Sequence, residues 1–431
     1  MRRFLLLLVM TAPIASVNTP SLLAQTFQDI GSLGLPNAFL ATEVFGISAD
    51  GQTFVGSIPH PNPVVFGAEA AFYWTPETGV TVIPDGGLFR SYAAMDVSAD
   101  GKTILIAGIT GIVNGESVRG YYLWTKEKGL EVVDLPLTFR SSIGRGGGFD
   151  MSSDGGTIVG TTPDEDDAFT DRAYQWSKST GTRFLADAAG LSSAEAFDVS
   201  AGGAVVVGYG SEAGDVATSA VIAWRAGTPL RLPMPTGTEV IRFAVVSNNG
   251  VAISGTYLDG QTGRLFRWTQ ETGTVTLEHP PVQPVGTGLA TIPGGITKDG
   301  SVIVGKTQQA TDPMDTGCNG GPVAFLWTSD KGTRSLKTAL IEDHGFDIAD
   351  WCVQTADHIS ADGRVIMGYA IDPDGQFVMY RAELKLDTEI IVNDTRDLPD
   401  SNPADDICDV DASADENQCT LRAAIQTANR R

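Results

Sequence analysis

A unit of about fifty residues recurs along this chain, and each copy has the same short motifs in the same order. Each copy begins with Ser-Ala-Asp-Gly or a close variant, continues with a short apolar segment that contains Gly, and then has an aromatic segment with Trp and a second Gly turn. In the first copy these places are held by Asp50-Gly51, Gly56, Trp74 and Gly79. Self-similarity at a fixed period is typical of propellers, solenoids and linear arrays, so this repeat constrains the architecture before any chemistry is considered.

Seven copies align on their first turn. The dipeptide there is of the kind that a two-residue hairpin turn demands, because Gly, Asn and Asp tolerate positive φ better than other residues. We therefore predict a hairpin between two strands at Asp50-Gly51, Asp100-Gly101, Asp154-Gly155, Gly202-Gly203, Asn249-Gly250, Asp299-Gly300 and Asp362-Gly363.

Two further residue types recur in every copy. A second Gly is expected to close the strand after the turn, at Gly56, Gly108, Gly160, Gly208, Gly255, Gly305 and Gly368. The aromatic strand follows, with Trp74, Trp124, Trp176, Trp224, Trp268 and Trp327 in six copies and Tyr380 in the place of Trp in the seventh.

Each unit is thus expected to hold three hairpin-linked strands, and most hold a fourth, as at residues 80–83 and 130–133. Four antiparallel strands in about fifty residues make one propeller blade. The seventh copy lacks its fourth strand, and residues 27–33 at the other end of the chain supply a candidate. The predicted fold is all-β: a seven-bladed β-propeller of four-stranded blades, with the ring closed by the N-terminal strand. The wide spacing between the last two turns leaves an error of one blade open.

The repeat resembles the bacterial extracellular repeat of the HAF family, in which an Ile-Ser-x-Asp-Gly strand is followed by Ala-Phe-x-Trp-Thr. Residues 71–75 and 324–328 carry this resemblance, and residues 27–33 resemble the recurring Asp-Ile/Leu-Gly strand of that family. The likeness covers residues 27–384. It implies a secreted, propeller-like bacterial protein, and it implies no activity.

The first 24 residues have the features of a secretory signal peptide. Arg2 and Arg3 precede an apolar run, and Ala24 is a small residue at a suitable cleavage point. The apolar run is short and is broken by Pro13, so we expect no membrane-spanning segment in the mature chain. The expected organisation is a signal peptide at 1–24, a propeller at 25–386, and an acidic linker with a cap segment at 387–431. The protein is expected to be secreted or held at the cell surface.

Composition agrees with a fold made of strands and turns. Glycine accounts for 50 of the 431 residues, above the roughly 7% average, and only the extreme C-terminus is predicted to be helical. The net charge of -23 predicts repulsion of nucleic acids and anionic membrane surfaces. We expect a monomer whose partner is an extracellular glycan or protein.

Four cysteines fit an oxidising compartment. Cys408 and Cys419 bracket a short acidic loop, and Cys318 and Cys352 flank the sixth aromatic strand. We predict two disulfides that pair them in this way, each worth a few kcal/mol (about 3 for a 15-residue loop). A zinc site is the competing interpretation, although His344 and His358 near Cys352 lack regular ligand spacing.

Residues 387–419 are rich in acids and contain one base, Arg396. Residues 408–429 resemble the CSLREA motif, which in its family stands at the entrance of a right-handed parallel β-helix. Thr420 can cap a short helix whose face would carry Leu421, Ala424, Ile425 and Ala428. Either the gene product is truncated after this cap, or the cap has lost its solenoid.

Candidate chemistry is sparse. None of the four histidines, His60, His279, His344 and His358, lies in a nucleophile motif, and we interpret them as loop or strand-end residues. The repeated tryptophans could form a stacking platform for a ligand. At one equivalent position per blade, however, large aromatic side chains are expected to fill the space between neighbouring sheets.

Acidic loops are the remaining candidates for a site. Calcium binds six to eight oxygens, which such loops can supply, although none has the spacing of a known calcium loop. A solvated acidic surface is the simpler interpretation, and we favour it. The candidate calcium ligands are Asp164, Glu165, Asp166, Asp167, Asp409, Asp411 and Asp415.

Two functions remain. We expect a secreted, non-enzymatic β-propeller that serves in binding, adhesion or cell-surface attachment, with no catalytic residue and no cofactor other than calcium. The alternative is a secreted polysaccharide- or peptide-degrading hydrolase or lyase whose site lies at the central channel. Convergent carboxylates or histidines in the mouth of that channel would favour the enzyme.

Overall fold

The structure is a computed structural model. It describes residues 26–30, 43–60, 68–113, 116–136, 149–164, 170–188, 190–212, 215–260, 262–280, 283–284, 290–308, 310–311, 321–384, 394–401, 410 and 419–428. The chain forms two compact units, Met1–Leu384 and Lys385–Arg431. The predicted signal peptide at 1–24 lies outside the described residues.

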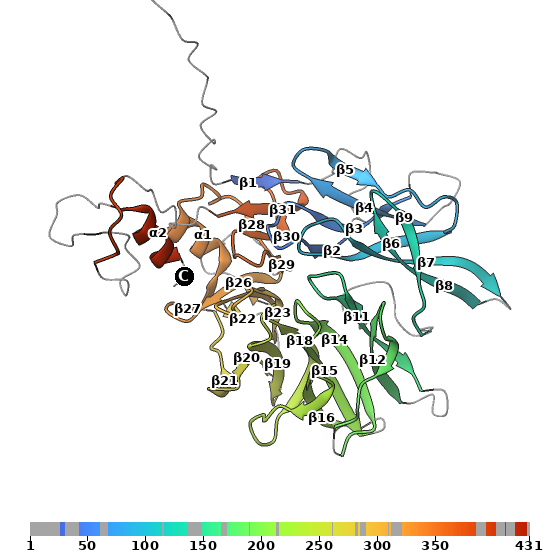
Figure 1. The fold of residues 1–431 in the computed structure, drawn as a ribbon. Coiled ribbons are helices and arrows are strands. Elements are labelled where there is room, and N and C mark those ends of the chain that lie inside the picture. Colours follow the sequence, from blue (N-terminus) through green and yellow to red (C-terminus); the bar gives the residue numbers. More distant parts are fainter. Residues whose placement is uncertain are drawn as a thin grey trace, which may run out of the picture. The chain divides into compact units, whose positions relative to one another are not determined.

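The first unit is built from antiparallel sheets whose strands follow one another in sequence (Figure 1). Four sheets have four strands each. The first has β2 (Glu43–Ile47), β3 (Phe54–Pro59), β4 (Glu69–Thr75) and β5 (Gly79–Val82), and the second has β6 (Ser91–Val97), β7 (Ile104–Val113), β8 (Glu116–Thr125) and β9 (Gly129–Val133). The third has β10 (Phe149–Met151), β11 (Thr157–Pro163), β12 (Asp171–Ser177) and β13 (Gly181–Phe184), and the fourth has β14 (Ser193–Val199), β15 (Val205–Glu212), β16 (Asp215–Arg225) and β17 (Thr228–Arg231).

The next strands follow the same order but join into one eight-stranded sheet, because a parallel bridge links Gly263 to Ala290. Its first half has β18 (Glu239–Val246), β19 (Ala252–Asp259), β20 (Thr262–Thr269) and β21 (Gly273–Thr276). Its second half has β23 (Ala290–Ile296), β24 (Val302–Gln308), β26 (Val323–Thr328) and β27 (Gly332–Ser335), while β22 (Gln283–Pro284) pairs with β25 (Ala310–Thr311).

The last sheet combines both ends of the first unit. It has β1 (Thr26–Asp29), β31 (Phe377–Glu383), β30 (Val365–Ile371), β28 (Cys352–Val353) and β29 (His358–Ile359). Repeated four-stranded antiparallel sheets are the blades of a β-propeller, so the all-β class and the propeller architecture are confirmed.

The N-terminal strand pairs with the strand that was predicted to lack a partner. Strand β1 runs antiparallel to β31, with Phe27 opposite Ala382, and the two lie side by side in Figure 1. The Phe27 ring stacks on Tyr380 at 5.0 Å between centroids and meets Trp351 edge-on at 4.9 Å. Aromatic packing therefore holds this strand in place in addition to its backbone hydrogen bonds.

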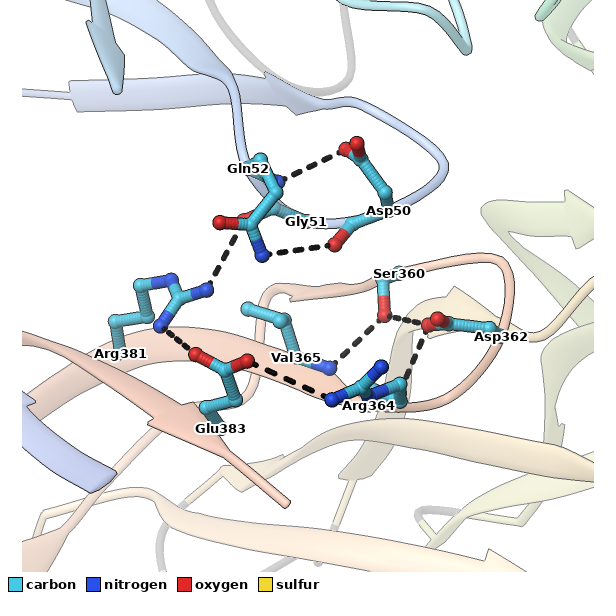
Figure 2. Close-up of polar contacts among 9 residues, drawn as sticks. All are labelled: Asp50, Gly51, Gln52, Ser360, Asp362, Arg364, Val365, Arg381 and Glu383. Atoms are coloured by element: carbon cyan, nitrogen blue, oxygen red, sulfur yellow. Dashed lines mark hydrogen bonds and ion pairs between the residues drawn. The ribbon is translucent and has the colours of Figure 1, made fainter. Parts of the chain in front are cut away.

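The first turn of each copy differs from the predicted two-residue hairpin. The loop spans residues 48–53, and only its Gly51 has positive φ, 67°. Asp50 contributes through its side chain, which accepts hydrogen bonds from the Ser48 hydroxyl (2.7 Å) and the Gln52 N–H (3.0 Å). Figure 2 shows the same arrangement in the last copy, where Ser360 bonds to Asp362 and the Val365 N–H donates to Ser360. The Ser-x-Asp-Gly motif thus encodes a side-chain-bonded loop.

The second Gly was predicted to close its strand, and this was wrong. Gly56 lies inside β3, opposite Val44 on one side and Phe72 on the other. A Cβ atom there would lie 1.8 Å from the carbonyl oxygen of Glu43, because a bulge at Phe45 brings the inner strand close. Gly is therefore required by the approach of two backbones. In the second copy the register places Ile106, not Gly108, at this position.

The tryptophans lie between sheets, as predicted. Trp224 is fully buried, and Trp124, Trp176 and Trp268 are each less than a tenth exposed. The seventh copy corrects one assignment: Gly368 pairs with Tyr380 as Gly56 pairs with Phe72. The position of Trp in that copy is consequently held by Ala382, and Tyr380 is the equivalent of Phe72.

The long spacing before the seventh copy contains a helix that the sequence analysis missed. Helix α1 (Leu336–His344) begins after Ser335, whose hydroxyl accepts a hydrogen bond from the Thr338 N–H, and ends at Gly345 in the left-handed conformation. Leu336 and Leu340 are buried in the hydrophobic core that also contains Tyr380. Serine at the start and glycine at the end are the expected helix caps.

The second unit contains the predicted C-terminal helix, α2 (Leu421–Ala428). Thr420 caps it, since its hydroxyl accepts a hydrogen bond from the Ala423 N–H at 3.1 Å. The predicted apolar face is divided, however: Ala424 is buried, whereas Leu421 and Ile425 are 64% and 52% exposed. No helix in the described part of the chain has the length and apolar character that a membrane crossing requires.

Candidate functional site

A cavity of about 460 Å³ lies where the innermost strands of the first unit meet. One aliphatic residue from each of β2, β6, β10, β14, β18, β23 and β29 lines it. We call these residues the aliphatic ring: Ile47, Val97, Met151, Val199, Val246, Ile296 and Ile359. These positions are equivalent in the seven copies, since each lies directly before the Ser or Thr that begins the repeated turn.

Larger apolar side chains line the cavity beside this ring. We call Phe45, Met95, Phe149, Phe197 and Phe243 the aromatic wall. They come from β2, β6, β10, β14 and β18, and each is partly exposed, Phe243 to 38%. Phe149 is held in place by stacking on Tyr121 at 4.9 Å. These side chains give the cavity an apolar part, and the rest of its lining is polar.

Three aspartates from consecutive blades also line the cavity: Asp96, Asp150 and Asp198. Each accepts a hydrogen bond from a backbone N–H of the following blade. The Asp96 Oδ2 atom accepts from Met151 (3.1 Å), the Asp150 Oδ2 atom from Val199 (2.9 Å), and the Asp198 Oδ2 atom from Val246 (2.7 Å). Side-chain hydrogen bonds also join Asp96 to Asp150 and Asp150 to Asp198. The three carboxyls therefore form a continuous chain across three blade junctions.

Burial governs the protonation of this chain. It raises the pKa of Asp96 to about 7, even though backbone hydrogen bonds favour the ionised form. It raises the pKa of Asp150 and of Asp198 well above the ordinary value, and in each case the neighbouring aspartate raises it further. Adjacent carboxyls that share hydrogen bonds titrate together, so the chain retains protons at pH values where ordinary aspartates are ionised.

The sixth and seventh copies contribute polar side chains to another part of the cavity lining. Lys306 and Asp357 both line it, with 3.6 Å between the Lys306 Nζ atom and an Asp357 carboxylate oxygen. His358 takes the place of the aspartates in its copy, and its Nε2 atom lies 3.2 Å from the carbonyl oxygen of Val44. The predicted loop or strand-end role of His358 is thus incomplete, because its buried ring bridges the seventh copy to the first and lines the cavity.

Sequence reasoning missed the three aspartates, although the chain carries a signal for them. Each lies between two apolar residues, two positions before the repeated Ser, in Met95-Asp96-Val97, Phe149-Asp150-Met151 and Phe197-Asp198-Val199. An acid inside a strand that is otherwise apolar needs a partner. Its recurrence in three consecutive copies indicates a partner that also recurs, namely the neighbouring blade.

The predicted calcium ligands do not coincide with this cavity. Asp164 is described, and its carboxylate lies 3.6 Å from Arg172. The other six, Glu165, Asp166, Asp167, Asp409, Asp411 and Asp415, lie outside the described residues. Where the chain is described, no group of three or more His, Cys, Asp or Glu side chains is arranged to hold a metal ion. Calcium binding stays a prediction, and so do both disulfides, since Cys318 and Cys408 lie outside the described residues while Cys352 and Cys419 lie within them.

Comparison with known proteins supports the fold and leaves the family open. No protein-family model matches the sequence, and no curated protein matches it either. The resemblance to the HAF family therefore stays a prediction. Among solved structures, an oligogalacturonate lyase in complex with manganese is 13% identical, with 80% of this chain and 89% of that chain covered and a TM-score of 0.50.

Two other solved structures are similar at lower scores. The β-propeller domain of the trilobed protease from Pyrococcus furiosus is 12% identical over 67% of this chain and 82% of its own, with a TM-score of 0.46. TolB from Acinetobacter baumannii is 13% identical over 78% of this chain, with a TM-score of 0.40. This chain spans 65% of the length of that TolB and 46% of the length of an acylaminoacyl peptidase. Such likeness concerns the fold alone.

Proposed function

We propose that the blades form a closed ring of seven. The support is a cycle of backbone hydrogen bonds in which the first turn of each copy donates to the first turn of the next. The donor and acceptor pairs are Ala49 and Ala99, Ala99 and Ser153, Asp154 and Ala201, Ala201 and Asn248, Asn249 and Lys298, Lys298 and Ala361, and finally Ala361 and Ala49. The last pair links the seventh copy to the first, as does the bond from Arg381 to Gly51 in Figure 2.

We further propose that the protein is a secreted, non-enzymatic binding propeller whose ligand occupies the cavity at the inner strands. The observation that supports this function is the cavity itself, with a volume of about 460 Å³ and a lining that combines apolar and polar groups. Sites of this size and composition hold small molecules or single side chains of larger partners. An extracellular protein or glycan would then be retained by one inserted group.

The hydrogen bonds that the three aspartate carboxyls make between blades favour a binding function over a catalytic one. The Asp150 carboxyl accepts the Val199 N–H and bonds to both neighbouring aspartates. A group used in acid–base chemistry must reach the reacting atom of a substrate, within about 3 Å or through one water. The hydrogen bonds at the blade junctions account for these carboxyls without a catalytic role, and their remaining lone pairs can accept from a bound donor.

A secreted hydrolase or lyase is the second candidate, and a specific observation favours it. Carboxyls from three blades and His358 line one cavity, and the pKa of Asp96 is raised to about 7. A carboxylic acid that keeps its proton near neutral pH is suited to act as a general acid. In this function Asp96 would protonate a leaving group, and an ionised neighbour would serve as base or nucleophile.

Glycan and peptide arrays followed by mass spectrometry of the retained material decide between the two. A binding propeller retains a ligand unchanged, and Phe197→Ala in the aromatic wall weakens retention. Phe377→Ala is the matched control, because Phe377 is exposed on β31 and lies outside the cavity. Turnover of the retained ligand that Asp96→Asn abolishes would establish the enzyme and overturn the binding proposal.

The remaining expectations concern the setting of the protein. We propose secretion, a monomeric state, and no binding of nucleic acid; the leader-like start of the sequence and the net charge of -23 support this view. The acidic C-terminal segment is proposed to be a CSLREA-like cap. N-terminal sequencing of the protein from culture medium tests secretion, with Gln25 expected as the first residue.

A further inference from the structure

The apolar part of the cavity lining can hold an apolar group. Six of the seven side chains in the aliphatic ring are less than a tenth exposed, and none offers a hydrogen bond. The aromatic wall adds phenylalanine and methionine, which have no polar end for binding sugar hydroxyls. A hydrocarbon chain gains from burial against these side chains.

The charged groups that line the cavity are mostly acidic. Asp96, Asp150 and Asp198 stand on one part of the lining, and Asp357 on another. Lys306 is the only lysine or arginine among the described lining residues, and its ammonium already has Asp357 at 3.6 Å. An anionic group would therefore find no unpaired lysine or arginine among the described lining residues, and the whole chain, at -23, repels it as well.

A cationic group finds favourable partners in the same place. The carboxyls can ionise in its presence, since an opposite charge nearby favours the charged form of an acid. Phenylalanine rings attract ammonium groups through their faces, and the attraction is stronger where water is excluded. A ligand with a hydrocarbon stem that ends in an ammonium group would suit this cavity. Its stem would pack on the aliphatic ring and the aromatic wall, and its ammonium group would contact the carboxyl chain.

We propose that the cavity binds the side chain of a lysine displayed by an extracellular protein partner. This inference rests on the proposed binding function of the cavity. The four methylenes of lysine pack on the aliphatic ring and the aromatic wall, while the ammonium meets the carboxyls of Asp96, Asp150 and Asp198. Because these carboxyls hold protons before binding, capture of the ammonium releases a proton to the solvent.

Isothermal titration of the full chain with matched tripeptides tests the proposal. The peptides are blocked at both ends and differ only in the central residue: lysine, norleucine, glutamate or acetyl-lysine. We expect the lysine peptide to bind at least about tenfold more tightly than the norleucine peptide, which has the same stem without the charge. The heat should also differ between buffers of different ionisation enthalpy, which reports the released proton. Free pentylammonium tests whether the ligand is a small amine instead of a protein side chain, and we expect it to bind more weakly than the lysine peptide.

Two variants locate the site. Asp150→Asn keeps an oxygen for the Val199 N–H, so the blades stay joined, and it should reduce the preference for lysine over norleucine. Asp374→Asn makes the same charge change in an exposed turn outside the cavity and should leave the preference intact. A far-ultraviolet spectrum and a thermal melt confirm that each variant is folded.

The outcomes separate this inference from the proposed function. Equal or tighter binding of the glutamate or norleucine peptide would overturn the lysine assignment while leaving the cavity as a binding site. If free pentylammonium binds more tightly than the lysine peptide, the ligand is a small amine and the assignment of a protein partner is overturned. Binding of lysine peptide that Phe197→Ala and Asp150→Asn leave unchanged would place the site elsewhere, and absence of binding by all probes would count against both proposals.

Discussion

Arg381, on the last strand of the first unit, donates a hydrogen bond from its Nη2 atom to the backbone carbonyl of Gly51 at 3.4 Å, across 330 residues of chain (Figure 2). Its Nη1 atom lies 2.8 Å from the Glu383 carboxylate, which Arg364 approaches at 3.8 Å. The Arg381 side chain is only 3% exposed. The hydrogen bond to Gly51 joins the first and last copies of the repeat, and the ion pair with Glu383, which lies on the same strand, orients the Arg381 side chain.

Replacement of Arg381 should be costly. Arg381→Met removes the closer partner of the mostly buried Glu383 and leaves Arg364 at 3.8 Å. An unpaired buried charge costs about 3–5 kcal/mol, and because Arg364 remains we expect a loss of about 2–3 kcal/mol of unfolding free energy. Urea denaturation measures the loss. Lys102→Met is the control, since its ion pair with Asp100 is largely exposed and should change stability by less than about 0.5 kcal/mol. If both variants lose the same amount, the Arg381 contact does not stabilise the junction.

The strand β1 should be required for full stability. Phe27→Ala removes a ring that stacks on Tyr380 and contacts Trp351. Because Phe27 is half-buried, we expect a loss of about 2 kcal/mol, roughly half the cost of a fully buried phenylalanine. Thermal unfolding gives the measurement, and Val132→Ala provides the comparison, because Val132 on β9 is 77% exposed. An unchanged melting temperature for Phe27→Ala would show that β1 contributes little.

Much of the fold followed from the sequence because its repeat is local. Gly51 and its six equivalents all have positive φ, and the fourth strands at β5 and β9 lie where they were expected. The roles of the residues were harder to predict. Asp50 acts through hydrogen bonds of its side chain, and Gly56 is required by a carbonyl oxygen on another strand. Such reasons depend on neighbours in space, which spacing along the chain does not reveal.

The sequence predicted where a site would lie in the fold, but not which residues line it. A central channel was expected, but the candidate ligands were assigned to acidic loops such as the one at Asp164, because clustered carboxylates are conspicuous in a sequence. The aspartates that line the cavity are isolated in apolar strands, and their meaning depends on contacts between copies: Asp96 contacts the third blade, and Asp198 the fifth. Helix α1 was missed for a similar reason, since it lies in an insertion without the repeat pattern.

Substitution by alanine should have different effects on stability at two glycines of the fourth blade. Gly208→Ala would place a Cβ atom 1.8 Å from the carbonyl oxygen of Glu195, so the strands β14 and β15 must separate. Gly202→Ala meets nothing within 4 Å and has no positive φ. We expect Gly208→Ala to lose about 2 kcal/mol or more, in the range of overpacked cores, and Gly202→Ala to be neutral or slightly stabilising. Chemical denaturation of both variants is the measurement, and equal stabilities would contradict the close approach at Gly208.

The carboxyl chain should make the protein less stable as pH rises from mildly acidic to neutral. The pKa of Asp96 is raised from 3.8 to about 7 in the folded state, and those of Asp150 and Asp198 are raised well above 3.8. Above pH 4 the unfolded chain therefore loses these protons while the folded chain keeps them. The folded state binds more protons in this window, so the free energy of unfolding falls with increasing pH. For Asp96 the decline ends near pH 7, where the folded state also ionises.

Urea denaturation between pH 4.5 and 7.5 measures this slope. Asp150→Asn removes one of the groups and keeps its hydrogen bond to the Val199 N–H, so the slope should become shallower. Asp343→Asn is the control: Arg334 and Lys331 lower the pKa of Asp343 to about 2, so its stabilising effect is lost only as pH falls below 4. The slope above pH 4.5 should be the same in this variant as in the natural chain. A stability that stays flat or rises between pH 4.5 and 7.5 would mean that the three carboxyls are ionised in the folded protein and that water or a cation reaches them.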